Sequence, residues 1–311
     1  MKSSGIGGQA VMEGIMMRNG SEYSVAVRKE NGEIEVKKET YRGVGAKCKL
    51  FRLPFIRGIF SFVDSLVLGM KSLNYSASLF MEEDGEPEEP SRFEKWLQDK
   101  FGDKAEKIIM DITMFVSIIA AVGIFMVLPA WISTLMKPIL GNGFWMALFE
   151  GVLRIAIFIA YVALISLMPD IKRTYMYHGA EHKCINCIEH GLPLTVENVM
   201  KSSKEHKRCG TSFLLIVMVI SILFFLVIRP ETLLLRLASR VLLIPVIAGV
   251  SFEFLRLAGN SDNPVVNLLS KPGLMLQGLT TREPDEKMAE VAICAVEAVF
   301  DWKAYEEANF K

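Results

Sequence analysis

The stretch ITMFVSIIAAVGIFMVLPAWISTLM, residues Ile112–Met136, decides the fold of this chain. It carries no charged residue over about 25 positions, and Asp111 and Lys137 bracket it. An α-helix rises about 1.5 Å per residue, so a helix of this length can cross the roughly 30 Å of hydrocarbon in a bilayer. The sequence therefore predicts an α-helical membrane protein.

Three more apolar runs follow this one along the chain. The first of them contains Glu150 and Arg154, which lie four residues apart, share a helix face and can form an ion pair. The last run is the weakest, because Glu253 and Arg256 interrupt it. The sequence thus predicts about four transmembrane helices, at Ile112–Met136, Phe144–Met168, Thr211–Ile228 and Val241–Ala258.

The loop 169–210, between the second and third predicted spans, is long and carries seven Lys and Arg residues. The other loops between the spans carry few. Basic loops are retained on the cytoplasmic side, and four spans then place both termini there as well. We therefore expect a multi-pass protein of the cell membrane, in which the N-terminal segment, this loop and the C-terminal tail share one side and can meet.

The N-terminal segment 1–50 is predicted to be β-rich. Residues 21–28 and 33–37 alternate apolar and polar side chains and flank Asn31-Gly32. This pattern predicts a β-hairpin with a type I′ turn, in which both turn residues adopt positive φ. Residues 7–14 add a third strand, so we predict a small antiparallel sheet in the cytoplasm.

Residues 51–81 place apolar side chains at helical spacing, but Asp64 and Lys71 interrupt them. This pattern favours an amphipathic helix that lies in the membrane interface. The alternative is that residues 55–80 span the membrane, which would put Asp64 in hydrocarbon at high cost.

Three segments follow this helix. Residues 82–91 form an acidic, proline-containing linker, and residues 92–258 form the membrane region. Residues 259–311 form a cytoplasmic tail, in which Pro284-Asp285 begins a helix predicted over 285–309. Its apolar face, from Ala289 to Phe300, should dock on the cytoplasmic domain or lie against the membrane.

Composition narrows the class of protein. The chain has 35 basic and 35 acidic residues, so its formal net charge is zero. A nucleic-acid-binding protein needs a basic surface, and we expect no nucleic-acid partner. The five cysteines, an odd number, favour thiols or metal ligands over a disulfide framework.

The sequence His178-Gly179-Ala180-Glu181-His182 carries the clearest chemical signal. On a helix, His178 and His182 lie one turn apart and face the same way, so both can bind one divalent ion, most plausibly zinc. Glu181 lies beside them and can act as the general base of a hydrolase. The alternative interpretation is that the histidines are polar residues at the membrane interface that hydrogen-bond loop carbonyls.

Candidates for further metal ligands lie downstream. His206 and Cys209 are the first choices, and Glu197 or Glu205 could contribute a carboxylate. A second pattern, Cys184-x2-Cys187 with His206-x2-Cys209, has a spacing compatible with a structural zinc site. The alternative for the first cysteine pair is that both are buried thiols within a helix.

Four motifs resemble the signatures of the YqhQ-like family of bacterial membrane proteins, which are described as predicted metal-dependent enzymes. They are GGQAVMEGIMMR (Gly7–Arg18), YHGAEHK (Tyr177–Lys183), RCGTSF (Arg208–Phe213) and TTREP (Thr280–Pro284). The resemblance covers nearly the whole chain and implies a multi-pass membrane protein. It also implies functional roles for Glu13, His178, Glu181, His182, Arg208 and Cys209, whereas Cys184 and Cys187 lie outside the motifs.

Two hypotheses for the function follow. The first is a membrane-embedded metal-binding protein, specifically a metal-dependent hydrolase at the cytoplasmic face, in which Glu13, Arg18 and Arg208 bind substrate. The second is a non-enzymatic membrane scaffold or assembly factor with a structural zinc site, which uses the sheet and the C-terminal helix to bind a membrane-protein partner or a second copy. A transporter is a more distant third, because the Glu150–Arg154 pair alone offers little substrate path.

Overall fold

A computed structural model describes most of the chain. The described residues are 2–46, 51, 53–81, 92–102, 105–141, 143–228, 230, 232–259, 261 and 263–310. They form two compact units, a first unit of residues 1–80, 159–221 and 243–311, and a second unit of residues 81–158 and 222–242. The predicted acidic linker 82–91 lies outside the described residues.

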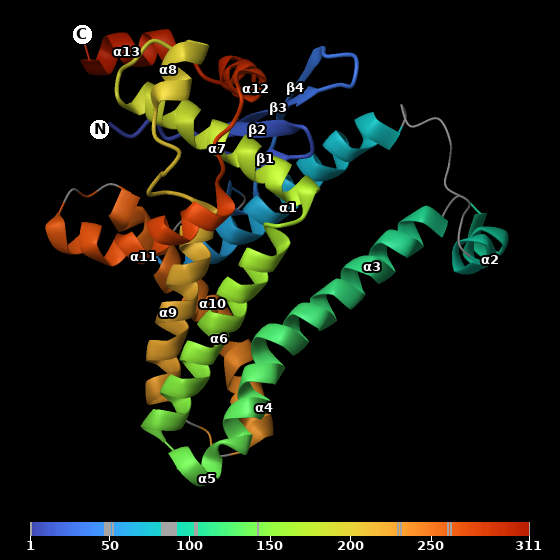
Figure 1. The fold of residues 1–311 in the computed structure, drawn as a ribbon, viewed down its shortest axis with the longest axis vertical. Coiled ribbons are helices and arrows are strands. Elements are labelled where there is room, and N and C mark those ends of the chain that lie inside the picture. The colour runs from blue at the N-terminus through green and yellow to red at the C-terminus, as the bar shows by residue number, and fades with distance from the viewer. Residues whose placement is uncertain are drawn as a thin grey trace. The chain divides into compact units, whose positions relative to one another are not determined.

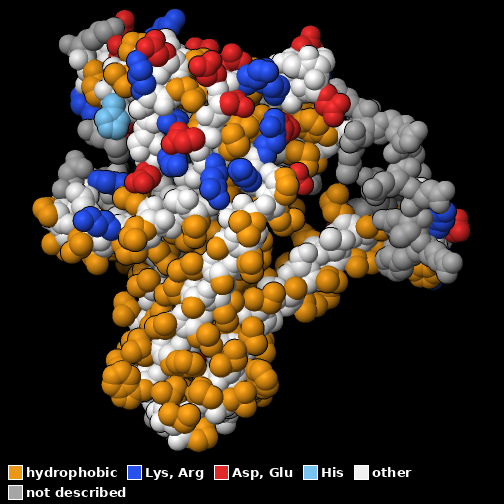
Figure 2. Space-filling view, viewed as in Figure 1, with side chains coloured by type: hydrophobic (Ala, Val, Ile, Leu, Met, Phe, Trp, Pro, Cys, Tyr) orange, Lys and Arg blue, Asp and Glu red, His pale blue; other side chains and the backbone are white. Residues whose placement is uncertain are grey.

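Four helical stretches in the described part of the chain are long and apolar enough to cross a membrane, which confirms the predicted α-helical membrane protein. Hydrophobic side chains cover the surfaces of these long helices (Figure 2). The fourth stretch begins at Leu234, well before the predicted start at Val241. The helices are α3 (Ala105–Val122) with η4 (Gly123–Val127) and α4 (Leu128–Leu135), α6 (Phe144–Ile165), α9 (Gly210–Val227) and α10 (Leu233–Gly259), with the shorter α2 (Arg92–Phe101) and α5 (Lys137–Leu140) before α6.

The first span changes its helical geometry midway. Residues Gly123–Val127 form a π-helical turn, and the N–H of Leu128 donates to the carbonyl of Gly123, five residues back. Pro129 follows at the start of α4. Proline lacks an N–H and its ring crowds the preceding turn of an α-helix, so a wider turn just before it relieves the clash.

The N-terminal segment forms a four-stranded antiparallel sheet in the order β1-β2-β3-β4, which confirms the predicted sheet and adds a strand (Figure 1). Short hairpins join its strands: Val11 pairs with Gly14, and Asn19 with Glu22. The strands are β1 (Gly7–Val11), β2 (Gly14–Asn19), β3 (Glu22–Arg28) and β4 (Ile34–Thr40).

The predicted type I′ turn at Asn31-Gly32 is wrong. Of these two residues only Gly32 has a positive φ, of 88°. The N–H of Gly32 donates to the carbonyl of Lys29, and the N–H of Lys29 donates to the carbonyl of Glu33. The hairpin therefore has a longer loop, with a turn that ends on a left-handed glycine, and Gly32 supplies the conformation that a side chain would resist.

Helices cover both faces of the sheet, because successive side chains on a strand point to opposite faces. On one face, Val11, Val25 and Val27 pack around Leu68 of α1 (Ile56–Met81). On the other face, residues such as Ile15 and Ala26 pack against α7 (Pro169–Glu189) and α12 (Glu286–Glu297). The sheet is thus the centre of the first unit.

Helix α1 has a buried and an exposed side. Leu68 and Asp64 face the sheet side, and Asp64 accepts hydrogen bonds from the hydroxyl of Tyr41 and the N–H of Val44. Its other side exposes a row of large apolar residues: Val63, Leu66, Val67, Met70 and Leu73. That amphipathic pattern supports the interfacial interpretation of residues 51–81, which stays a prediction.

The C-terminal tail differs from its prediction in two ways. Helix α11 (Pro264–Thr280) was not predicted, and it forms although it contains Pro272 and Gly273, two residue types that disfavour a helix. The single helix 285–309 is wrong: α12 ends at Glu297, and α13 (Trp302–Phe310) begins after Asp301, whose carboxylate accepts from the N–H of Ala304.

The apolar face of the predicted tail helix is buried inside the protein. Ala289, Val291, Ala292, Ala295 and Val296 are buried in the same core as β2 and α7. The predicted meeting of the N-terminal segment, the long loop and the tail is therefore confirmed. The scaffold hypothesis loses the exposed helix face that motivated it.

Candidate metal centre

Helix α7 carries the two histidines. Pro169 and Asp170 begin it, as suits the first turn of a helix, and it ends at Glu189 before Gly191, which has a φ of 70°. The helical geometry predicted for the His178–His182 motif is thus confirmed. The two imidazole rings lie with their centroids 4.4 Å apart.

A third possible ligand, Cys209, lies directly before α9. The ligand atoms of His178, His182 and Cys209 all lie within 4.8 Å of one another. The Sγ atom of Cys209 is 3.3 Å from Nε2 of His178 and also accepts the backbone N–H of Thr211. The N-terminus of a helix favours negative charge, so this position suits a thiolate ligand.

Backbone carbonyls fix the tautomer of both histidines. Nδ1 of His178 lies 2.8 Å from the carbonyl oxygen of Thr280, and Nδ1 of His182 lies 2.7 Å from that of Lys204. A carbonyl oxygen only accepts hydrogen bonds, so Nδ1 is the donor in each ring, and in the neutral tautomer this leaves a lone pair on Nε2. This is the outer-sphere arrangement that orients histidine ligands in metal sites.

Glu181 lies near the Nε2 atoms of both rings. One of its carboxylate oxygens is 3.9 Å from Nε2 of His178 and 3.9 Å from Nε2 of His182. Burial raises the pKa of Glu181, and the charge of His178 and a hydrogen bond from the backbone of Gly8 only partly oppose it. A Cβ on Gly8 would lie 2.9 Å from Cγ of Glu181, so only glycine lets β1 approach so closely.

These three donors fit a zinc ion. In a tetrahedral site, Zn–N bonds of about 2.1 Å and Zn–S bonds of about 2.3 Å place donor atoms about 3.5 Å apart. The Cys209–His178 separation of 3.3 Å is close to that value. Two imidazoles and one thiol are a donor set that could hold a metal ion.

His206 lies next to this group but has another partner. Its ring centroid is 5.8 Å from that of His182, and its Nε2 lies 3.4 Å from a carboxylate oxygen of Glu189. Its backbone is bound by Gln277, which accepts from the N–H and donates to the carbonyl. Among the described residues, the group of possible ligands contains His178, His182 and Cys209. His206 lies beside His182 but is not part of the group.

Arg208 and Arg18 line an open cavity of about 520 Å³ in the first unit, which also reaches Gly8. Arg208 donates to Glu189 and to the hydroxyl of Ser3. Arg18 donates to the carbonyl of Gly20 and lies over the ring of Tyr41. Gly8 lines the cavity and also lies against Glu181, but Glu181, His178, His182 and Cys209 are not among the residues that line the cavity.

Glu13 lies at the turn between β1 and β2, with a φ of 48°. Its carboxylate accepts two hydrogen bonds from the guanidinium of Arg173 and one from the hydroxyl of Tyr177. Both partners come from α7. The structure therefore uses Glu13 to hold the sheet against the helix that carries the histidines.

The structure does not bring the other candidate ligands into the described group. Cys184 is fully buried in the core, and Sγ of Cys187 faces the carbonyls of Leu192 and Pro193. Burial raises the pKa of both thiols, that of Cys187 to about 11, which disfavours the thiolates a zinc site needs. Glu197 pairs with Lys201 on the short helix α8 (Val196–Lys201).

Sequence reasoning missed the groups that hold the site in place. The carbonyls of Thr280 and Lys204 and the amide of Gln277 carry no sequence signature of their own. Gly179 does: a Cβ there would lie 2.0 Å from the carbonyl oxygen of Arg282. The motif Thr280–Pro284 thus crosses α7 at the one position that has no side chain, and the pairing of these two motifs could have suggested the contact.

Comparison with known proteins supports the resemblance seen in the motifs. The family described as "Protein of unknown function (DUF1385)" matches residues 53–302. "Uncharacterized protein YqhQ" of Bacillus subtilis (strain 168) is 35% identical over 306 residues, which covers 98% of this chain and 95% of the relative. No solved structure matches the chain.

Proposed function

The chain belongs to the DUF1385 family, and from the geometry of its site we propose that it is a membrane-embedded metal-binding protein with hydrolytic activity. The observation that carries the proposal is the convergence of His178, His182 and Cys209, with Glu181 beside both imidazoles. Three ligands and an adjacent carboxylate are the parts that metal-assisted hydrolysis requires.

In the proposed site, Nε2 of His178, Nε2 of His182 and Sγ of Cys209 hold zinc. When bound, zinc would supply Lewis acidity for the hydrolysis. Glu181, which lies beside both imidazoles, would act as the general base that accepts a proton from the attacking water and returns it to the leaving group.

The cavity that Gly8, Arg18 and Arg208 line supports an anionic substrate. Arg18 and Arg208 line it, and guanidinium groups bind carboxylate and phosphate oxygens in pairs. In this proposal the two arginines orient the substrate, while Glu13 positions α7 through Arg173.

Metal analysis of the purified full-length protein tests the site. We expect about one zinc per chain in the wild type and only trace zinc in the His178→Ala/His182→Ala double variant. His190→Ala is the matched control, because His190 directly follows the same helix and its ring bonds only the carbonyl of Asn186 in the described structure. Equal, trace zinc in all three proteins would disprove the metal site.

A Glu181→Gln variant separates a catalytic from a structural metal. The amide keeps the size of the side chain but cannot accept a proton, so we expect wild-type zinc content and a loss of function in cells that depend on the protein. If Glu181→Gln supports those cells as well as the wild type does, the metal is structural and the scaffold hypothesis is favoured.

A further inference from the structure

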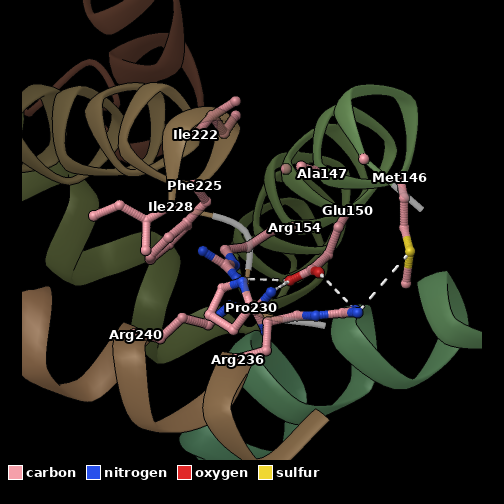
Figure 3. Close-up of a pocket in the computed structure, with 12 residues that line it drawn as sticks. Met146, Ala147, Glu150, Arg154, Ile222, Phe225, Ile228, Pro230, Arg236 and Arg240 are labelled. Carbon is pink, nitrogen blue, oxygen red and sulfur yellow. Dashed lines mark hydrogen bonds and ion pairs between the residues drawn. The ribbon is translucent and has the colours of Figure 1, made fainter. Parts of the chain in front are cut away.

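The second unit contains a group of charged residues within its apolar helices. Glu150 and Arg154 lie on α6, and Arg236 and Arg240 lie on α10. All four line one partly enclosed cavity of about 200 Å³ (Figure 3). The cavity wall is otherwise mainly apolar, with Met146, Ile222, Phe225, Ile228 and Pro230.

Glu150 is the anion around which the three guanidiniums gather in Figure 3. Its carboxylate accepts a hydrogen bond of 3.2 Å from Arg154. Arg240 forms an ion pair with the same carboxylate, and a guanidinium nitrogen of Arg236 lies 3.8 Å from it. The hydroxyl of Ser133 also donates to it, at 3.3 Å. A single carboxylate is therefore the shared counterion of three guanidinium groups, each of which carries a permanent positive charge.

The charges of this cluster do not balance. Three guanidiniums and one carboxylate leave two uncompensated positive charges among the described residues that line the cavity. A charged residue inside a membrane span is costly unless it is paired. Phe225 offers some compensation, since the guanidiniums of Arg154 and Arg240 lie 5.6 Å and 5.4 Å from its ring centroid.

The donors of the arginines are not all used either. Nε of Arg154, Nη1 of Arg236, and Nε and Nη1 of Arg240 are buried without a hydrogen-bond partner among the described residues. The Arg240 residue as a whole is only 3% exposed. A buried polar donor without a partner costs free energy, so this cavity is built for an acceptor that bears negative charge.

We propose that this cavity binds the phosphate group of an anionic ligand, in a site separate from the metal centre. The planar guanidinium forks match pairs of phosphate oxygens. The phosphodiester of a lipid headgroup supplies one of the two missing negative charges, and an inorganic phosphate ion supplies more than one. The phosphate belongs either to the headgroup of an anionic lipid or to a soluble phosphate ion. The apolar wall favours the lipid source, because an acyl chain can lie along it.

The test uses the full-length protein in nanodiscs of phosphatidylcholine alone and of phosphatidylcholine mixed with phosphatidylglycerol. Native mass spectrometry measures retained phosphatidylglycerol, and the melting temperature in phosphatidylcholine discs measures binding of inorganic phosphate. Retention of phosphatidylglycerol assigns the site to a lipid headgroup, and stabilisation by inorganic phosphate assigns it to the soluble ion. If the wild type neither retains phosphatidylglycerol nor is stabilised by inorganic phosphate, the proposal is overturned.

Two variants change the binding in opposite directions. Arg236→Gln/Arg240→Gln removes two charged donors and should weaken binding about tenfold or more. Glu150→Gln removes the competing carboxylate and should bind the anion more tightly than the wild type does. If the Glu150→Gln protein, folded by circular dichroism, loses binding as the arginine variant does, the cluster is only structural and the proposal fails.

Arg57→Gln is the matched control. Arg57 pairs with Glu253 in the first unit. The Arg57→Gln variant therefore removes one positive charge from a different ion pair. Its anion binding should equal that of the wild type. A loss of binding in this variant as large as in Arg236→Gln/Arg240→Gln would mean that binding follows total charge, and would also overturn the proposal.

Discussion

At the scale of single residues, the candidate metal centre depends on two positions without a side chain. Gly8 lets β1 approach Glu181, and Gly179 lets the chain at Arg282 cross over α7. That crossing is fixed by the N–H of Arg282, which donates to the carbonyl of Tyr175. It also brings the carbonyl of Thr280 to His178. The tautomer of one ligand thus depends on the absence of a methyl group one residue away.

Gly179→Ala should therefore damage the site without touching a ligand. The new Cβ would meet the Arg282 carbonyl oxygen at 2.0 Å, and we expect a loss of about 1–3 kcal/mol of stability together with reduced zinc content. Gly278→Ala in α11 is the control, because a Cβ there meets nothing within 4 Å and alanine favours a helix. Thermal unfolding in detergent and metal analysis measure both effects, and an equal response of the two variants would contradict the account.

Glu189 gives the first unit a defined acid sensitivity. Burial by itself raises its pKa, but hydrogen bonds from His206 and Ser4 and the charge of Arg208 outweigh burial and lower the pKa to about 2. A carboxyl whose pKa is lower in the folded state stabilises the fold above its unfolded pKa of 4.5. That contribution, about 3 kcal/mol, is lost as the pH falls from 4.5 toward 2.

The measurement compares the pH dependence of unfolding in wild type and Glu189→Gln. We expect the wild type to lose stability relative to the variant across that acid range, and the gap between them to be constant at neutral pH. Parallel curves from neutral pH down to 2 would show that Glu189 is not the group responsible.

At the scale of elements, α1 shows how one helix can serve two environments. Its Leu68 is 1% exposed in the core beneath the sheet, whereas Leu66, two positions earlier, is 54% exposed on the opposite side. The same residue type therefore has a packing role in one position and faces outward in the other. Under the interfacial interpretation, the outward side is covered by lipid.

A pair of leucine variants tests this division. Leu68→Ala should cost about 2–5 kcal/mol of stability, because it leaves a cavity in a well-packed core. Leu66→Ala should change the free energy of unfolding by less than about 0.5 kcal/mol in detergent. Chemical unfolding of both variants gives the comparison, and a larger cost at Leu66 than at Leu68 would reverse the assigned faces.

How much of the fold the sequence could predict depends on the range of the interaction. The spans were predictable because hydropathy is a local property, and the His178–His182 face was predictable because both residues lie on one helix. Helix α11 was missed because the local cost of Pro272 and Gly273 is outweighed by tertiary contacts, such as the Gln277 bonds to His206. The carbonyl partners of the histidines could not be predicted either, since every residue carries the same carbonyl.

The arginine cluster marks the same limit more sharply. The Glu150–Arg154 pair is a spacing of four on one helix, and it was predicted and is present. Arg240 reaches the same carboxylate from a helix that follows about 90 residues later along the chain. Only the packing of α6 beside α10 reveals that three cations share one anion.

At the scale of the whole molecule, the proposed topology predicts which residues share a compartment. Four spans and the basic loop 169–210 would place Lys201 and Lys303 in the cytoplasm, and the short connection at Ile139 outside. Ile139 is 78% exposed in α5 and offers an accessible position.

Labelling with a membrane-impermeant maleimide tests the topology in intact cells. Ile139→Cys should react from outside, whereas Lys201→Cys and Lys303→Cys should react only after lysis. The labelling of the unmodified chain is subtracted as background in each case. Labelling of Lys201→Cys and Lys303→Cys from opposite sides would exclude a shared cytoplasmic site.

The π-helical turn at Gly123–Val127 has a consequence for the rotational phase of the first span. A π-turn holds one residue more than an α-turn, and each residue of an α-helix advances the side chains by about 100°. Removing one residue there would restore a regular α-helix and rotate Ser133 away from Glu150 by that angle. The hydropathy of the span would hardly change, so the helix would still insert. However, residues after the deletion would turn a different helix face toward the neighbouring helices.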